Sequence, residues 1–257
     1  MARTAIITGA SSGIGKATAV VLAEAGYDVG LTYHADEDGA KETQAEVEEH
    51  GQRAFVRQLD LSDATSGPGV VEELIEELGH LDVFVNNAGE GSSTPFLEQD
   101  LEEWRRVLDV DLTGAFLSMQ AAARHMVDRG QGGRIVAVTS VHEHVPLLGS
   151  SAYCAAKGGL GLLLKVMALE LGEYDITVNA IAPGEIATKM TGQHEEEPEA
   201  GSRPGLAITR PGNAFEIAHA VRYLASPEAS YTTGASLNVD GGLMLMGAEA
   251  NRRLAES

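Results

Sequence analysis

Short apolar runs rich in β-branched residues alternate with longer amphipathic stretches along most of the chain. The apolar runs, which we expect to form strands, are residues 4–8, 27–33, 53–58, 82–85, 134–139, 177–181 and 235–239. The stretches with a helical period are residues 14–24, 36–50, 70–78, 101–129, 151–172 and 214–225. Strands that alternate with helices in this way predict βαβ units and a parallel sheet.

Two of the predicted strands carry no polar alternation. Val83-Phe84-Val85 and the run at residues 135–138 are apolar at every position, which is typical of strands covered by helices on both faces. Because the alternation of strand and helix continues along the chain, we expect one doubly wound α/β domain over residues 1–257.

Residues 190–212 break this rhythm. The segment is polar, contains several Gly and Pro residues, and has no hydrophobic period that would order it. Long insertions without secondary structure in compact domains are often lids or disordered segments. We expect residues 190–212 to form a mobile lid over the active site rather than a plain solvated loop.

Composition fits a soluble protein. The chain has 257 residues, of which 44% are hydrophobic and 22% charged, and a chain of this length can bury a sizeable core. The single cysteine, Cys154, excludes an internal disulfide framework and a thiolate metal cluster. Because no continuous apolar run reaches about 18 residues and the N-terminal run is too short for a signal peptide, we predict a cytoplasmic location.

The charge balance is strongly acidic. Asp and Glu total 38 against 18 Lys and Arg, which gives a net charge of −20. Such a surface repels nucleic-acid phosphates and anionic lipids, so we expect neither nucleic acid nor membrane as a partner. Two readings of the acidity stay open, namely ordinary surface solvation and adaptation to high salt.

A glycine-rich loop joins the first predicted strand to the first helix. It reads Thr8-Gly9-Ala10-Ser11-Ser12-Gly13-Ile14-Gly15. Glycines at this point permit a tight turn and close approach of the backbone to a pyrophosphate, which the helix N-terminus then attracts. Two further strand ends meet the same edge of a parallel sheet, where such ligands bind. The predicted cofactor-binding residues here are Gly9, Ser11, Ser12, Gly13, Ile14, Gly15, Asp60, Leu61, Asn87, Ala88 and Gly89.

A tyrosine and a lysine open the helix after the fifth strand. Tyr153 and Lys157 are four residues apart and therefore share a helix face, and Ser140 ends the preceding strand. Transfer of a hydride to a carbonyl requires a proton for the developing alkoxide. A phenol with an ordinary pKa near 10 exchanges protons poorly at neutral pH, and a neighbouring ammonium group stabilises its phenolate.

The glycine spacing, Asn86-Asn87-Ala88-Gly89 and Tyr-x-x-x-Lys together resemble the short-chain dehydrogenase/reductase family. The resemblance extends from Thr8 to Val239-Asp240-Gly241-Gly242. It implies a Rossmann-like sheet of about seven parallel strands, a nicotinamide cofactor and a homotetramer. It also implies roles for individual residues of these motifs.

The resemblance assigns Tyr153 as the catalytic acid and base. Lys157 would tune this tyrosine and bind the nicotinamide ribose, and Ser140 would hydrogen-bond the substrate oxygen. The segment after the sixth strand resembles the part of the family that wraps the nicotinamide carboxamide. Its cofactor-binding residues would be Pro183, Gly184, Ile186 and Thr188.

One position departs from the family pattern. The family motif Asn-Leu-x-Gly appears here as Asp111-Leu112-Thr113-Gly114. In the family the asparagine belongs to a proton relay through its backbone carbonyl, which Asp111 retains. An ionised Asp111 side chain would oppose deprotonation of Tyr153 and help to hold Lys157 charged, so we expect activity with an altered pH profile.

The form of the nicotinamide cofactor depends on the end of the second strand. An acid there would bind the adenosine ribose and repel a 2′-phosphate. The sequence has His34 instead, with no acid until Asp36, and Ser12 where a base would read the phosphate. With the acid missing, we favour NADP over NAD and place His34 in the cofactor site.

The substrate is less defined than the reaction. Ser140-Val141-His142-Glu143 resembles bacterial glucose 1-dehydrogenases, whereas the whole chain resembles bacterial diacetyl or acetoin reductases. We expect reversible reduction of a small ketone or diketone, with sugar dehydrogenase or 3-oxoacyl reductase as the alternative and a nucleotide-sensing binding protein as the non-enzymatic one. Predicted substrate-contacting residues are Ser140, His142, Tyr153 and Glu185.

We expect no metal, because His142 and His144 have no well-spaced third ligand.

Overall fold

The chain folds around one seven-stranded parallel sheet. The computed structural model describes residues 2–63, 65–192, 201–203 and 206–246. The strand order is β3-β2-β1-β4-β5-β6-β7, and every pairing is parallel. The strands are β1 (Arg3–Ile7), β2 (Tyr27–Tyr33), β3 (Ala54–Gln58), β4 (Val83–Asn86), β5 (Gly133–Val138), β6 (Ile176–Pro183) and β7 (Ser236–Val239). The predicted Rossmann-like α/β fold is therefore confirmed.

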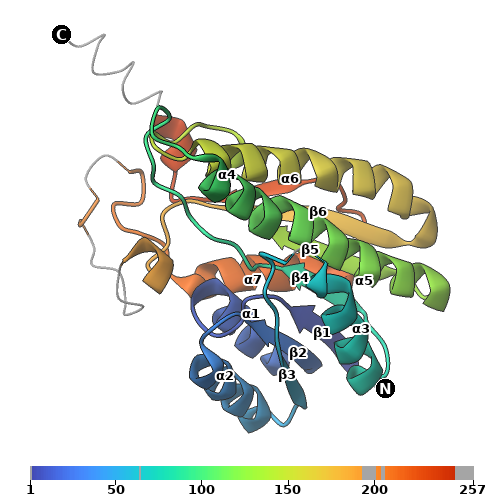
Figure 1. Ribbon diagram of the computed structural model, residues 1–257. Helices are drawn as coiled ribbons and strands as arrows, with labels where there is room; N and C mark the ends of the chain where they lie inside the picture. Colours follow the sequence, from blue (N-terminus) through green and yellow to red (C-terminus); the bar gives the residue numbers. More distant parts are fainter. Residues whose placement is uncertain (1, 64, 193–200, 204–205, 247–257) are drawn as a thin grey trace.

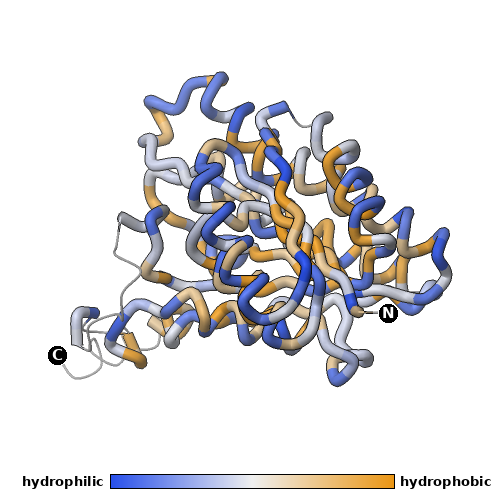
Figure 2. Tube along the Cα trace, turned by 90° about the horizontal axis from the view of Figure 1, so that it is seen from below, coloured by the Kyte–Doolittle hydropathy of each residue, from blue (hydrophilic) through white to orange (hydrophobic). Residues whose placement is uncertain are grey.

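Helices cover both faces of the sheet (Figure 1). They are α1 (Gly13–Glu24), α2 (Glu37–Glu49), α3 (Ser66–Leu78), α4 (Leu101–Leu108), α5 (Ala115–Arg129), α6 (Ser151–Leu171) and α7 (Ala214–Ala225). One apolar core joins the sheet to α1, α2 and α7, and a second joins it to α3, α5 and α6. Figure 2 shows the resulting pattern, with apolar positions along the central strands and polar positions on the outer helix faces and loops.

The strand order reverses between β1 and β4. The connection after β1 runs to β2 on one side, while β4 continues the sheet on the other side. The crevice at the carboxyl ends of two such strands is where open α/β sheets bind their ligands. The glycine-rich loop follows β1, and Asn86-Asn87-Ala88-Gly89 spans the end of β4, so both motifs reach this crevice.

The long helix predicted at residues 101–129 has a different internal structure. Between α4 and α5 the chain forms a π-helical segment, Asp109–Gly114. A side chain at Gly114 would come within 2.9 Å of the Leu61 side chain, so the helix lies very close to the loop after β3. Single π-turns often occur at functional sites, and this one carries Asp111. Helix α3 also begins at Ser66, four residues before its predicted start.

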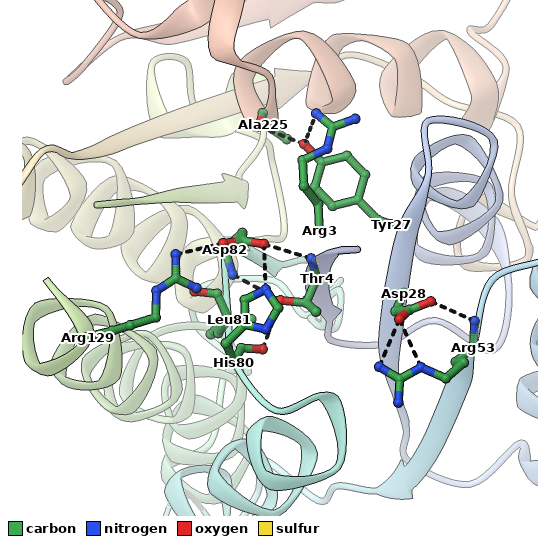
Figure 3. Close-up of polar contacts among 10 residues, drawn as sticks. All are labelled: Arg3, Thr4, Tyr27, Asp28, Arg53, His80, Leu81, Asp82, Arg129 and Ala225. Atoms are coloured by element: carbon green, nitrogen blue, oxygen red, sulfur yellow. Dashed lines mark hydrogen bonds and ion pairs between the residues drawn. The ribbon is translucent and has the colours of Figure 1, made fainter. Parts of the chain in front are cut away.

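A polar network joins residues at the amino ends of the strands, on the side of the sheet opposite to the crevice (Figure 3). The Asp82 carboxylate accepts a hydrogen bond from the backbone N–H of Thr4 at 2.9 Å and pairs with Arg129 at 2.7 Å. His80 Nε2 lies 3.2 Å from the same carboxylate. One side chain thus joins β1, the start of β4 and the end of α5.

Helix α6 is the longest in the described part of the chain. By length and composition alone it could cross a membrane, the one described helix of which this is true. Its inner face packs on the sheet through Leu160, Leu164 and Ala168, which are buried. The same helix carries Tyr153 and Lys157 near its start. Packing on the sheet accounts for the apolar residues of its inner face.

We predict that Asp82→Ala lowers the free energy of unfolding by about 2 kcal/mol, because the Thr4 amide and the Arg129 guanidinium lose a partly buried charged acceptor. Chemical denaturation would measure the loss. Glu76→Ala removes an exposed carboxylate from α3 and is the matched control, with an expected change below about 0.5 kcal/mol. Equal stability of the two variants would show that the network does not hold the sheet edge.

Candidate active site

A cleft of about 570 Å³ lies at the carboxyl ends of the strands. Residues from the loops after β1, β2, β3, β4, β5 and β6 line it. Most of the residues predicted from the sequence are brought together there, namely Gly9, Ser11, Ser12, Gly13, Ile14, His34, Asp60, Leu61, Asn87, Ala88, Gly89, Ser140, Tyr153, Lys157, Pro183, Gly184, Ile186 and Thr188. The cleft thus connects the glycine-rich loop with the tyrosine and lysine of α6.

The glycine-rich loop is shaped by close backbone contacts. Gly9 has φ +67°, and a Cβ there would lie 2.9 Å from Cα of Ala88. A Cβ on Gly15 would lie 2.1 Å from the carbonyl oxygen of Gly9, so α1 can begin beside the strand only with glycine at this position. The Asn87 side chain donates to the carbonyls of Thr8 and Gly9, both at 3.0 Å, and fixes the loop against β4.

The N-terminus of α1 fits a bound dinucleotide phosphate. Ser12 is the N-cap residue of this helix, and its side chain makes no capping hydrogen bond within the described structure. Ser11, Ser12, Gly13 and Ile14 all line the cleft. Backbone N–H groups at the start of a helix, with the positive end of its dipole, attract phosphate. A nicotinamide dinucleotide is therefore compatible with the residues that this loop presents.

The tyrosine and lysine of α6 lie on one face of the helix, at the floor of the cleft. Lys157 Nζ lies 5.5 Å from the centre of the Tyr153 ring. The lysine is 3% exposed, whereas Tyr153 is half-buried. Ser140 follows β5 and accepts a hydrogen bond on its Oγ from the backbone N–H of His142 at 3.1 Å. A proton donor, a cation and a hydroxyl thus share the cleft.

Asp111 is wholly buried behind Lys157. Its Oδ2 lies 3.2 Å from Lys157 Nζ, and its Oδ1 accepts the backbone N–H of Glu90 at 2.7 Å. Burial by itself lowers the pKa of Lys157, but the carboxylate of Asp111, with smaller contributions from Tyr153 and Glu143, raises this pKa above its ordinary value. The ammonium beside Tyr153 is therefore kept charged by a buried counterion.

Four of the predicted residues do not line the cleft. Gly15 packs behind the glycine-rich loop, and Asp111 lies behind Lys157. The ring of His142 meets that of Tyr153 edge-on, with centroids 6.3 Å apart. Glu185 forms a two-pronged ion pair with Arg203, whose Nε lies 2.9 and 2.8 Å from the two carboxylate oxygens.

The described parts of the predicted lid at 190–212 attach to the chain near Glu185. Gly212 donates its N–H to the carbonyl of Glu185 at 2.8 Å and accepts from Ala187 at 2.9 Å. Residues 193–200 and 204–205 of this prediction lie outside the described residues. The two ends of the segment therefore leave and rejoin the rim of the cleft.

The side chains of His142-Glu143-His144, a segment that could suggest a metal site, contact other groups of the protein. His144 Nε2 lies 2.9 Å from the buried Glu143 carboxylate, which also accepts the hydroxyl of Ser236. His142 Nδ1 lies 3.1 Å from the carbonyl of Val145. Among the described residues no group of three or more His, Cys, Asp or Glu side chains converges as a metal site would require.

Several cleft residues were not predicted from the sequence. The most informative are four charged side chains, namely Asp36, Glu90, Arg106 and Lys189. Two of them directly follow predicted residues, since Glu90 comes after Gly89 and Lys189 after Thr188. Their position next to predicted residues was the signal in the sequence that could have identified them. Burial and the neighbouring Asp111 raise the pKa of Glu90, although the ion pair with Arg106 opposes the shift.

Comparison with known sequences gives matches along almost the whole chain. A family model described as enoyl-(acyl carrier protein) reductase matches residues 9–244. The uncharacterized oxidoreductase YohF of Escherichia coli K12 is 52% identical over 251 residues, which cover 98% of this chain and 99% of that protein. Glucose 1-dehydrogenase 2 of Bacillus subtilis and a 3-oxoacyl-[acyl-carrier-protein] reductase of Synechocystis are each 38% identical, over 95% of this chain and 95% and 98% of theirs.

Solved structures of similar proteins are also those of oxidoreductases. Acetoin dehydrogenase YohF from Salmonella typhimurium superposes with a TM-score of 0.92 at 52% identity, covering 95% of this chain and 97% of that one. Carveol dehydrogenase from Mycobacterium avium, solved in complex with NAD, gives a TM-score of 0.85 at 30% identity, covering 95% and 98%. The glycine-rich loop, the tyrosine and lysine of α6 and these matches lead to one conclusion: the chain belongs to the short-chain dehydrogenase/reductase family of oxidoreductases, as its motifs predicted.

Proposed function

We propose that the protein catalyses reversible hydride transfer between NADP(H) and a small ketone or diketone, with the corresponding secondary alcohol as product. The observation that carries the proposal is the placement of Ser140, Tyr153 and Lys157 in the same cleft as the glycine-rich loop. The bound nicotinamide would supply or accept the hydride. The similarity to acetoin dehydrogenase supports a small substrate of this kind.

The side chains of the cleft divide the remaining work. Tyr153 donates a proton to the substrate oxygen during reduction and removes it during oxidation, and Ser140 hydrogen-bonds the same oxygen. Lys157 stabilises the phenolate of Tyr153 and binds the nicotinamide ribose, while its counterion Asp111 holds it in place. Ordered side chains of this kind stabilise charge that develops in the transition state.

The cofactor would bind along the strand ends. The loop from Gly9 to Ile14 would bind the pyrophosphate. The adenosine would be bound by His34 and by the residues that follow β3 and β4, namely Asp60, Leu61, Asn87, Ala88 and Gly89. Pro183, Gly184, Ile186 and Thr188 would contact the nicotinamide end. The lack of an acid before Asp36 at the end of β2 favours NADP over NAD, and the carboxylate of Asp36 is itself engaged by the backbone N–H of Gly39 and by Lys189.

Sugar oxidation is the second candidate activity. The stretch from Ser140 to Glu143 resembles glucose 1-dehydrogenases, and a protein of that name is 38% identical to this chain. In this reading His142 and Glu185, which do not line the cleft, would contact sugar hydroxyls only after moving, and Glu185 would first have to leave Arg203. Residues 190–212, which we expect to act as a lid, would then close over a larger substrate.

The first prediction for this function concerns Tyr153. With NADPH or NADH and a carbonyl panel led by diacetyl, Tyr153→Phe should lower kcat by about 100-fold or more, because the proton donor is lost. Cofactor oxidation followed at 340 nm measures the effect. Tyr231→Phe, at a fully exposed phenol, is the control and should retain wild-type activity. Tight cofactor binding without turnover of any carbonyl or sugar would instead support a nucleotide-sensing protein.

The second prediction concerns Asp111. Asp111→Asn should move the alkaline limb of the pH profile of alcohol oxidation to lower pH. This limb moves because Lys157 loses the counterion that raises its pKa, so the ammonium beside Tyr153 is lost at lower pH. Rate profiles from pH 6 to pH 11 measure the shift. An unchanged profile with reduced activity would assign Asp111 a purely structural role.

The third prediction concerns assembly as a homotetramer. Leu162, Val166 and Leu169 share the outer face of α6 and are all exposed, with Leu169 at 86%. An apolar stripe of this kind on a helix is suited to contact with a second copy of the chain. Light scattering should give four times 27.0 kDa for the wild type and a smaller species for Leu169→Glu. A monomeric wild type would refute the assembly.

A further inference from the structure

An ion pair bridges the two rims of the cleft at its adenosine end. Lys189 Nζ lies 3.5 Å from Oδ2 of Asp36, although the two residues are 153 positions apart in the chain. Asp36 lies just after β2, and Lys189 begins the short helical turn Lys189–Thr191 after β6. Both residues line the cleft. The bridge therefore connects the part of the cleft beside β2 with the segment that carries Thr188.

The carboxylate of this pair is held in a fixed position. Asp36 is the N-cap residue of α2, and its Oδ1 accepts the backbone N–H of Gly39 at 2.9 Å. Its second oxygen is the one that meets Lys189. The hydrogen bond from Gly39, with a further contribution from Lys189, lowers the pKa of Asp36, so the group is charged at neutral pH.

The lysine, in contrast, is the more exposed partner of the pair. Its side chain is 69% exposed and that of Asp36 is 45% exposed, and an exposed ion pair with a long lysine side chain contributes little stability. Lys189 can therefore leave Asp36 at a small cost in free energy when a stronger anion enters. A phosphate dianion is such an anion, since it offers more charge and three acceptor oxygens.

Two other basic side chains near the end of β2 lie beside carboxylates of their own. His34 Nε2 lies 3.6 Å from an Asp60 oxygen, and Lys41 lies 2.7 Å from Glu37 on the outer side of α2. Of the lysines, only Lys189 and the buried Lys157 line the described cleft. Lys189 is thus the exposed ammonium available to a group that binds beside the end of β2.

We propose that Lys189 binds the 2′-phosphate of NADP(H), and that Asp36 holds Lys189 when this phosphate is absent. The assignment rests on the proposed nicotinamide function and deepens it. NAD(H) lacks the 2′-phosphate, and its pyrophosphate is assigned to the glycine-rich loop, so the Asp36–Lys189 pair stays closed when NAD(H) binds. The balance between the carboxylate and the phosphate as partners of one ammonium then sets the preference between the two cofactors.

Calorimetric titration of the purified protein with NADP⁺ and with NAD⁺ tests this assignment without any substrate. Lys189→Gln should weaken NADP⁺ binding about 10-fold, the loss expected for one charge-assisted hydrogen bond, and leave NAD⁺ binding within about 2-fold. Asp36→Asn keeps an N-cap residue on α2 and removes the charge. It should strengthen NADP⁺ binding several-fold, because the competitor for Lys189 is gone.

Lys41→Gln is the matched control. It removes an ammonium of comparable exposure, 60% against 69%, from the neighbouring helix, where the partner is Glu37, and should change both affinities by less than about 2-fold. Equal losses for NADP⁺ and NAD⁺ in Lys189→Gln, or no loss, would overturn the assignment while leaving the oxidoreductase function intact. A wild-type protein that binds neither nucleotide would refute the function itself, and the assignment with it.

Discussion

The ammonium group of Lys157 is buried in the protein, and much of the site is arranged to compensate for this burial. A charge removed from water requires an opposite charge and hydrogen bonds nearby. Asp111 supplies the charge, and the π-helical segment between α4 and α5 places it 3.2 Å away. Gly89 leaves the necessary space, since a Cβ there would lie 3.0 Å from Lys157 Nζ and 3.2 Å from Asp111 Oδ1. The backbone of Glu90 then orients the carboxylate.

The sheet topology determines what this charged pair faces. Because the strand order reverses between β1 and β4, the loops after these strands diverge and leave a crevice. The glycine-rich loop approaches Ala88 across it, and helix α6 brings Tyr153 to the same edge. One cleft can therefore bind a dinucleotide pyrophosphate beside a reactive phenol, although Gly9 of the loop and Tyr153 lie 144 positions apart.

The fold and the local motifs of the site could be predicted from the sequence because their signals are short-range. Alternation of strands and helices gave the sheet, and the four-residue spacing of Tyr153 and Lys157 placed both on one helix face. The π-helical segment was not predicted, because its residues are compatible with an ordinary α-helix. The pairing of Asp36 with Lys189 was also missed, since nothing local links positions 153 residues apart. His142 and Glu185 illustrate the same limit, because proximity to a motif does not determine whether a side chain faces the cleft.

The amino and carboxyl ends of the strands have separate roles. The Asp82 network joins the amino ends of the strands (Figure 3), while the residues that line the cleft lie at the carboxyl ends. Substitutions that reshape a binding pocket commonly reduce stability, and a reserve of stability elsewhere lets a protein tolerate them. Reinforcing the Asp82 edge would therefore give a scaffold in which the loops around the cleft can be diversified for new substrates.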